Sequence, residues 1–142
     1  PEPLWIGMAR ADAIGGPWVK EPTPIIGPSD DDIWRNHGAG SIKLLDESVD
    51  DRLIALNNGI YVEADGTTGS AIRVLSSSDG VTWEDVCGEP ILRPSGLDDW
   101  KRAFIYGFDT ARTEQGELRL YFNARDGWVP GVERIGMATL VE

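Results

Sequence analysis

The sequence holds very few of the residues that make covalent cross-links or metal sites. Cys87 is its single cysteine and His37 is its single histidine among 142 residues. One cysteine excludes a disulfide within the chain, and one histidine excludes the multi-histidine and Cys/His patterns of zinc sites. The acidic runs at 30–32 and 50–51 lack the ligand spacing of a dedicated calcium loop. We therefore expect solvated turns there, and predict no metal site and no cofactor.

Basic residues and long apolar runs are also scarce. Thirteen Lys and Arg stand against 24 Asp and Glu, which gives a net charge of −11. Such a chain repels a phosphate backbone, so nucleic acid is not an expected partner. No apolar run approaches the ~20 residues of a membrane span, so no membrane contact is predicted. No signal-peptide pattern is visible at the start of the sequence, and the cellular location stays open.

What the sequence does contain is an internal repeat. The segment 22–34 matches the segment 88–100, with Pro24, Ile25, Pro28 and Trp34 each recurring 66 residues later. The tetrapeptide Ile-Gly-Met-Ala at 6–9 recurs at 135–138, about two periods away. A fixed period of this length is typical of proteins built from stacked supersecondary units.

Each period reads as consecutive β-strands separated by Gly, Pro, Asn and Asp. We predict strands at 40–45, 52–63, 70–77 and 82–92, with a tight turn at Ser78-Asp79-Gly80. The same register predicts strands at 4–11 and 17–26 before this unit, and at 107–113, 117–124 and 133–141 after it. Both faces of 52–63 are largely apolar, which suits a sheet packed between two others. Trp18, Trp83 and Trp100 are expected to pack between sheets.

The predicted fold is therefore all-β: a β-propeller-like tandem of four-stranded antiparallel meanders with nine strands and essentially no helix. We divide the single domain 1–142 into a half unit at 1–34, a full unit at 35–100 and a three-stranded unit at 101–142. A partial propeller leaves edge strands with unpaired backbone groups. Self-association into a homodimer or larger ring through these edges is one expectation, and a longer chain that carries the missing units is the other.

Some of these residues carry a resemblance to a known group of proteins. Ser-Ser-Asp-Gly-Val-Thr-Trp at 77–83, then Glu-Pro-Ile-Leu-Arg-Pro at 89–94 and a tryptophan, resembles the blade signature of five-bladed propeller glycosidases of glycoside hydrolase families 43 and 32. The resemblance covers about two to two and a half blades. It implies a carbohydrate-related function, with site residues on the innermost strands around a central funnel.

The resemblance places the candidate site at 36–41 and 106–110. The first stretch has no carboxylate where the families carry an aspartate, and the second offers Asp109. Asp109 is our candidate catalytic carboxylate and His37 a candidate base. The alternatives are a bond of Asp109 to Arg112 or to a neighbouring blade, and an ordinary loop or core role for His37. Trp128 is the candidate for stacking on a sugar ring, with a hinge or interface role as its alternative. The further candidate ligand-binding residues are Trp34, Asn36, Tyr106 and Arg112.

Two functions remain open from the sequence. The first is a carbohydrate-binding or assembly module, with a glycan as the ligand. The second is a glycoside hydrolase or a subdomain of one, which needs a second carboxyl group within roughly 5–9.5 Å of the first. The sequence does not supply a complete carboxylate set, so we expect binding rather than hydrolysis.

Overall fold

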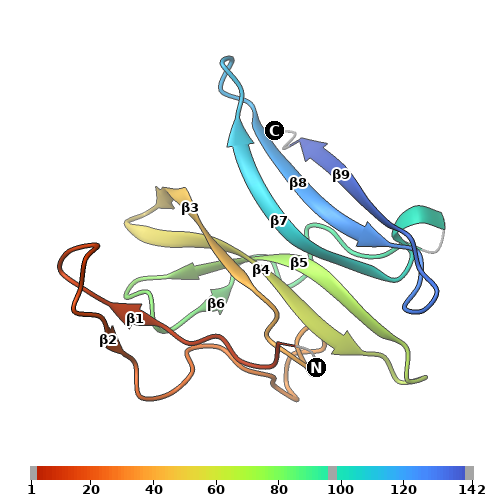
Figure 1. Ribbon diagram of the computed structural model, residues 1–142, viewed down its shortest axis with the longest axis horizontal. Coiled ribbons are helices and arrows are strands. Elements are labelled where there is room, and N and C mark those ends of the chain that lie inside the picture. Colours follow the sequence, from red (N-terminus) through yellow and green to blue (C-terminus); the bar gives the residue numbers. More distant parts are fainter. Residues whose placement is uncertain (1–2, 96–98, 140–142) are drawn as a thin grey trace.

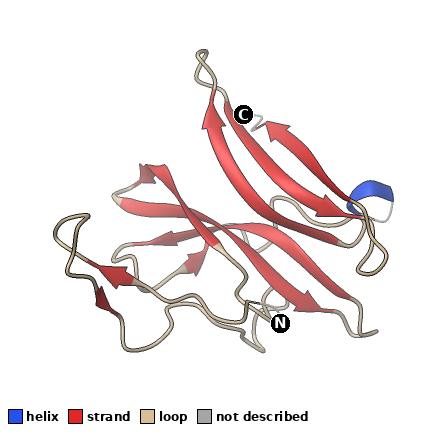
Figure 2. Cartoon of the chain, in the orientation of Figure 1, coloured by secondary structure: helices blue, strands red, loops and turns tan. Residues whose placement is uncertain are grey.

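The computed structural model describes residues 3–95 and 99–139, and in these ranges it shows nine β-strands and one three-residue 3-10 helix. The prediction of an all-β chain with nine strands is confirmed (Figure 2). The elements are β1 (Ala9–Arg10), β2 (Val19–Lys20), β3 (Ile42–Val49), β4 (Arg52–Val62), β5 (Thr68–Ser77), β6 (Glu84–Asp85), η1 (Asp99–Lys101), β7 (Phe104–Arg112), β8 (Leu118–Arg125) and β9 (Glu133–Thr139).

The strands form three antiparallel groups. β1 and β2 make a short hairpin, β3 to β6 make one meander, and β7 to β9 make a second meander (Figure 1). One parallel pair, Ser70 opposite Phe104, joins β5 to β7 and links the two meanders into a continuous sheet. Within the described ranges this sheet is open, with β3 and β9 at its two ends.

The repeat found in the sequence is also seen in the backbone hydrogen bonds, which join equivalent residues in two successive units. Ile6 bridges Ile26, and Ile72 bridges Leu92, which are the same two positions shifted by 66. The Ile25 amide donates to the Ile6 carbonyl at 2.8 Å, and the Ile91 amide donates to the Ile72 carbonyl at 2.9 Å. The period therefore reports a repeated backbone geometry.

The meander β3–β6 is covered on both faces, as its two-sided apolar pattern predicts. One core cluster contains Leu56, Ile72, Ile105 and Phe122, and lies between this meander and β7–β9. The other contains Ile26, Ala39 and Leu75, and lies between the meander and the N-terminal segment. Ile72 and Leu75 point to opposite faces of β5 because side chains alternate along a strand.

Two predicted segments form shorter strands than expected. The strand predicted at 82–92 is regular only in β6, because the Asp85 carboxylate accepts bonds from the Cys87 and Gly88 amides and turns the chain there. The strands predicted at 4–11 and 17–26 shrink to β1 and β2, since the prolines that follow β2 have no N–H to donate. Trp18 is 57% exposed in this hairpin, so packing between sheets was the wrong expectation for it.

The turn at Ser78-Asp79-Gly80 forms as predicted. The Asp79 carboxylate accepts bonds from the Val81 and Thr82 amides, each at 2.8 Å, and Gly80 has a φ of +75°. The hydrogen bonds that the backbone amides of Thr82 and Val81 donate lower the pKa of Asp79 to about 2. Trp83 donates its indole N–H to the Gly80 carbonyl at 3.0 Å, so this motif has a folding role.

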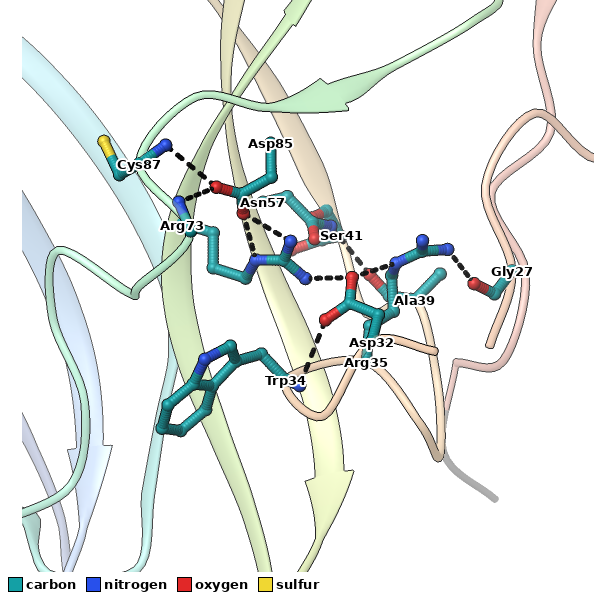
Figure 3. Close-up of polar contacts among 11 residues, drawn as sticks. Gly27, Asp32, Trp34, Arg35, Ala39, Ser41, Asn57, Arg73, Asp85 and Cys87 are labelled. Carbon is teal, nitrogen blue, oxygen red and sulfur yellow. Dashed lines mark hydrogen bonds and ion pairs between the residues drawn. The ribbon is translucent and has the colours of Figure 1, made fainter. Parts of the chain in front are cut away.

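A buried ion cluster closes the meander β3–β6 (Figure 3). The Arg73 side chain on β5 is only 4% exposed, and its guanidinium donates to Asp32 at 2.6 Å and also to Asp85. Arg35 donates to the same Asp32 carboxylate at 3.1 Å. The acidic run at 30–32 was expected to be a solvated turn, and for Asp32 this was wrong because the buried guanidinium requires a counter-ion.

The charge of Asp32 depends on this cluster. Burial by itself raises the pKa of Asp32, but the hydrogen bond and positive charge of Arg73, with bonds from Arg35 and the Trp34 amide, hold it below its usual 3.8. A carboxyl group with a lowered folded-state pKa stabilises the fold fully above its unfolded-state pKa. That contribution is lost as the pH falls through the folded-state value.

We expect Asp32→Asn to lower the free energy of unfolding by about 3 kcal/mol at pH 7, as for the loss of one partner from a buried ion pair. The stability difference from wild type should narrow below pH ~4, where the wild-type carboxylate is itself protonated. Denaturant titration across the pH range measures both effects. Asp31→Asn, at the exposed neighbouring position, is the control, and equal stability of the two variants at pH 7 would contradict this role of Asp32.

A glycine on the third strand of the second meander makes room for aromatic packing. Gly136 on β9 lies opposite Phe122, and Phe122 stacks on Trp100 with ring centroids 5.9 Å apart. A Cβ atom at Gly136 would lie 2.5 Å from both rings. Gly7 occupies the same place in the Ile-Gly-Met-Ala motif, but a Cβ atom there meets nothing within 4 Å.

We therefore expect Gly136→Ala to reduce the free energy of unfolding by about 2 kcal/mol, the usual penalty for overpacking. Gly7→Ala should stay within about 0.5 kcal/mol of wild type, as for an unconstrained surface position. Chemical denaturation of the two variants tests this, and a Gly136→Ala protein as stable as Gly7→Ala would show that the aromatic pair adjusts freely.

Candidate functional site

A cavity of about 310 Å³ opens between the two meanders, near the point where β5 meets β7. Its volume lies at the lower end of the range for small-molecule sites. Its aromatic lining residues are Phe104, Tyr106 and Trp128, and its polar ones are Ser41, Asn58, Ser70 and Arg125. The site therefore combines flat apolar surface with a small number of hydrogen-bonding groups.

Ser70 fixes the position of the two meanders beside the cavity. Its hydroxyl donates to the Ile105 carbonyl at 2.8 Å and accepts from the Ile105 amide at 3.2 Å. Ser70 is 3% exposed and Ile105 is fully buried, so these bonds are shielded from water. Because the Ser70 side chain pairs with both the backbone amide and the backbone carbonyl of Ile105, β7 is held in a defined register against β5.

Two consecutive asparagines shape the opposite side. Asn57 donates from Nδ2 to the carbonyls of Ala39 at 2.7 Å and Ser41 at 2.8 Å. Asn58 accepts at Oδ1 from the Ser41 amide at 2.9 Å and from its hydroxyl at 2.7 Å. Gly40, between Ala39 and Ser41, has a φ of +62°, and a Cβ atom there would collide with the backbone carbonyl of Asn58. These bonds hold Ser41 at the cavity.

Trp128 and Phe104 form an aromatic wall at the rim. Their ring centroids are 5.1 Å apart with an interplanar angle of 51°. Trp128 is 57% exposed, so part of its ring is free for a ligand. The same two residues also line a neighbouring hollow of about 520 Å³, which His37 and Thr68 complete. The structure thus brings the predicted residues Tyr106, Trp128 and His37 around one shared wall.

Tyr106 belongs to a polar cluster with Glu133 and Asn123. Burial, the hydrogen bond to Glu133 and the charge of Glu133 together raise the pKa of Tyr106 to about 12, against a smaller opposing effect of Arg125. The bonds from Tyr106 and Asn123 lower the pKa of Glu133, which is therefore an ionised acceptor. The Tyr106 hydroxyl remains protonated and donates to Glu133.

The other predicted residues lie outside this cavity. Asp109 on β7 forms an ion pair with Lys43 on β3, and Arg112 pairs with Glu47 on β3. The first of these is the contact with a neighbouring meander that we gave as an alternative for Asp109. Lys43 and Asp109 are 66 residues apart and so hold the same position in successive repeats.

Trp34 and Asn36 have packing and hydrogen-bonding contacts at the end of β4. Trp34 packs edge-on against Tyr61 with centroids 5.2 Å apart. Asn36 donates to the Val62 carbonyl at 3.0 Å and accepts from the Val62 amide at 2.8 Å. Their assignment as ligand-binding residues, like the catalytic assignments of Asp109 and His37, remains a prediction.

The sequence analysis missed several residues at the site, among them Ser70, Phe104, Asn58, Arg125 and Glu133. Asn58 and Arg125 lie on second strands of their meanders, β4 and β8, whereas the resemblance directed attention to innermost strands. Glu133 reaches Tyr106 only through the pairing of β8 with β9, where Arg125 lies opposite Glu133. The double asparagine within an apolar strand is the one signal in the sequence that marked a special position.

The described ranges meet the requirements of neither a membrane-spanning helix nor a metal site. No helix in them is long and apolar enough to cross a membrane. No group of three or more His, Cys, Asp or Glu side chains in them is arranged to hold a metal ion.

Comparison with known proteins shows a similarity of fold. No protein-family model and no curated protein sequence matches the chain. Similar solved structures include a complex of BT0996 with RGII, with a TM-score of 0.55 and 11% identity over 96% of this chain and 57% of that one. A glycosyl hydrolase from Bacteroides ovatus has a TM-score of 0.53 and 15% identity over 75% of this chain and 29% of that one.

A third similar structure is an N-acetylgalactosamine deacetylase from F. plautii in complex with blood group B trisaccharide. It has a TM-score of 0.51 and 18% identity, over 87% of this chain and 39% of that one. The chain therefore spans between 29% and 57% of the lengths of these structures. The resemblance to glycoside hydrolases predicted from the sequence is confirmed as a resemblance of fold.

Proposed function

We propose that this chain is a carbohydrate-binding module of a propeller-like protein, and that its glycan site is the cavity between the two meanders. The observation that carries the proposal is the exposed face of Trp128, packed on Phe104, beside the polar groups of Asn58 and Arg125. An aromatic face suits the C–H surface of a sugar ring, while polar groups suit its hydroxyls. The deacetylase of similar fold was solved with a trisaccharide, which supports this ligand class.

Binding is favoured over hydrolysis by the position of the carboxylates. Glycoside hydrolysis uses two carboxyl groups on either side of the scissile bond. Among the residues that the structure describes, none that lines the cavity is acidic. Asp109 is paired with Lys43, and Glu133 accepts bonds from Tyr106 and Asn123. A hydrolase would need carboxylates from another copy or another segment.

We expect Trp128→Ala to weaken glycan binding about tenfold, because a lost aromatic contact of about 1.4 kcal/mol corresponds to that factor. Trp18→Ala is the matched control, since Trp18 is also 57% exposed but lies on the β1–β2 hairpin. Calorimetric titration with a panel of oligosaccharides measures the effect. Equal binding by the two variants would reject the site, and release of reducing sugar by the wild type would reject the choice of binding over hydrolysis.

The proposed module also associates with a second copy through its sheet edges. β9 is the last strand of its sheet in the described part of the chain, and Ile135 and Met137 on it are 75% and 52% exposed. The β1–β2 hairpin likewise exposes Trp18 and Val19. Free backbone groups beside apolar side chains favour pairing with another strand.

Light scattering should accordingly give a mass above the 15.5 kDa of one chain, rising with concentration. We expect Ile135→Lys to shift the particle toward the monomer, because a charge on an edge strand opposes pairing. Val129→Lys, at a position 83% exposed in a loop, is the control. A mass of one chain at every concentration would favour the alternative, in which a longer chain supplies the missing strands.

A further inference from the structure

The cavity differs in charge from the rest of the molecule. The chain carries a net charge of −11, yet Arg125 is the one charged residue among the described residues that line the cavity. A positive group in a concave, partly apolar site attracts anions more strongly than the same group on an open surface. The site therefore favours a negatively charged ligand group, although the protein as a whole repels one.

Arg125 is not neutralised by a direct ion pair in the described part of the chain. Its side chain makes a 3.3 Å bond from Nη2 to the Gly131 carbonyl and also contacts the Tyr106 hydroxyl. Its Nε atom is enclosed, and no acceptor for it is present among the described residues. Glu133 is the nearby anion: it accepts bonds from Tyr106 and Asn123, and the charge of Arg125 also lowers its pKa, although the two side chains form no direct ion pair. A charged donor that is enclosed without an acceptor is costly.

Asn58 adds a second donor to the same cavity. The residue is only 5% exposed, and its Oδ1 atom already accepts two bonds from Ser41. The Nδ2 group donates to no protein acceptor in the described ranges, so it is the part of this amide that remains for a ligand. With Arg125, the described lining of the cavity offers donors and no acidic side chain, which is the arrangement that an acceptor-rich group requires.

We infer that the cavity recognises the carboxylate of an acidic sugar, with Arg125 binding the carboxylate and Trp128 packing against the sugar ring. This inference rests on the proposed glycan-binding function of the same cavity. A guanidinium matches a planar carboxylate because two of its N–H groups can donate in parallel to the two oxygens. Asn58 donates to a ring hydroxyl or to the same carboxylate. The ligand class is therefore uronic-acid-containing oligosaccharides.

The test compares sugars that differ only in this charge. Oligogalacturonate and oligoglucuronate are titrated into the wild-type protein at pH 7, alongside the methyl ester of each, which removes the charge and keeps the sugar backbone. We expect at least one acid to bind tenfold or more tightly than its ester. Raising the salt concentration should reduce this preference, because ions screen the charge.

The variants assign the preference to one side chain. In Arg125→Gln the acid should bind only as tightly as its ester. In Arg125→Lys the affinity for the acid should lie between those of the wild type and of Arg125→Gln, since lysine keeps the charge and loses the planar fork. Arg119→Gln is the control on the same strand, where Arg119 pairs with Glu117 at the surface. Thermal unfolding of each variant shows whether Arg125 is also required for folding, and Arg125→Lys then carries the comparison.

Two results separate this inference from the proposed function. Equal binding of acid and ester, weakened alike by Trp128→Ala, would leave the glycan site in place and reject the carboxylate. A tighter complex with sulfated than with carboxylated galactose oligomers would also reject it. A preference for the acid that persists in Arg125→Gln would place the anion site elsewhere. Absence of any binding to the panel, with Trp128→Ala equally inert, would reject both proposals.

Discussion

The structure depends on one buried cation. Arg73 is almost entirely shielded from water, and its charge is tolerated because Asp32 and Asp85 both accept from it. Asp32 comes from the loop before β3 and Asp85 from β6, so the guanidinium ties the two ends of one meander to its centre. The loop that carries Asp32 continues to residues 39–41, which are hydrogen-bonded to the side chains of Asn57 and Asn58. Arg73 thus anchors the start of this loop, and the two asparagines hold Ser41 at the cavity.

The repeat explains why the candidate site is asymmetric. Positions 66 residues apart in successive units carry different side chains, as with Lys43 on β3 and Asp109 on β7, which form an ion pair between the two meanders. Gly40 and Tyr106 are also 66 residues apart, but only Gly40 has a positive φ, of +62°. One repeat therefore contributes a tight glycine bend, and the other contributes the Tyr106 ring. A cavity between two copies of one motif becomes polar on one side and aromatic on the other.

Much of the fold could be predicted because its signals are local. The turn residues Asp79 and Gly80, the alternation along 52–63 and the 66-residue period placed β4, β5, β7 and β8 within three residues of their observed bounds, whereas the strands predicted at 4–11, 17–26 and 82–92 are regular over two residues each. The errors came from tertiary context: the Asp85 turn shortened the fourth strand, and Trp18 stayed exposed in a two-stranded hairpin. Of the predicted residues, Tyr106 and Trp128 line the cavity and His37 lines the neighbouring hollow, whereas the paired Asp109 and Arg112 lie elsewhere, and the functional role of each stays a prediction.

By itself, the sequence determined the repeat and the succession of strands along the chain, and its single cysteine excludes a disulfide within the chain, since these follow from composition and from periodicities within each segment. Only the tertiary structure decided which side chains share the cavity. Ser70 and Ile105 are 35 residues apart, and their two hydrogen bonds set how β5 meets β7. That contact brings Asn58 and Arg125 into one site. The register between two meanders is fixed by such distant contacts, and no local pattern in either meander encodes it.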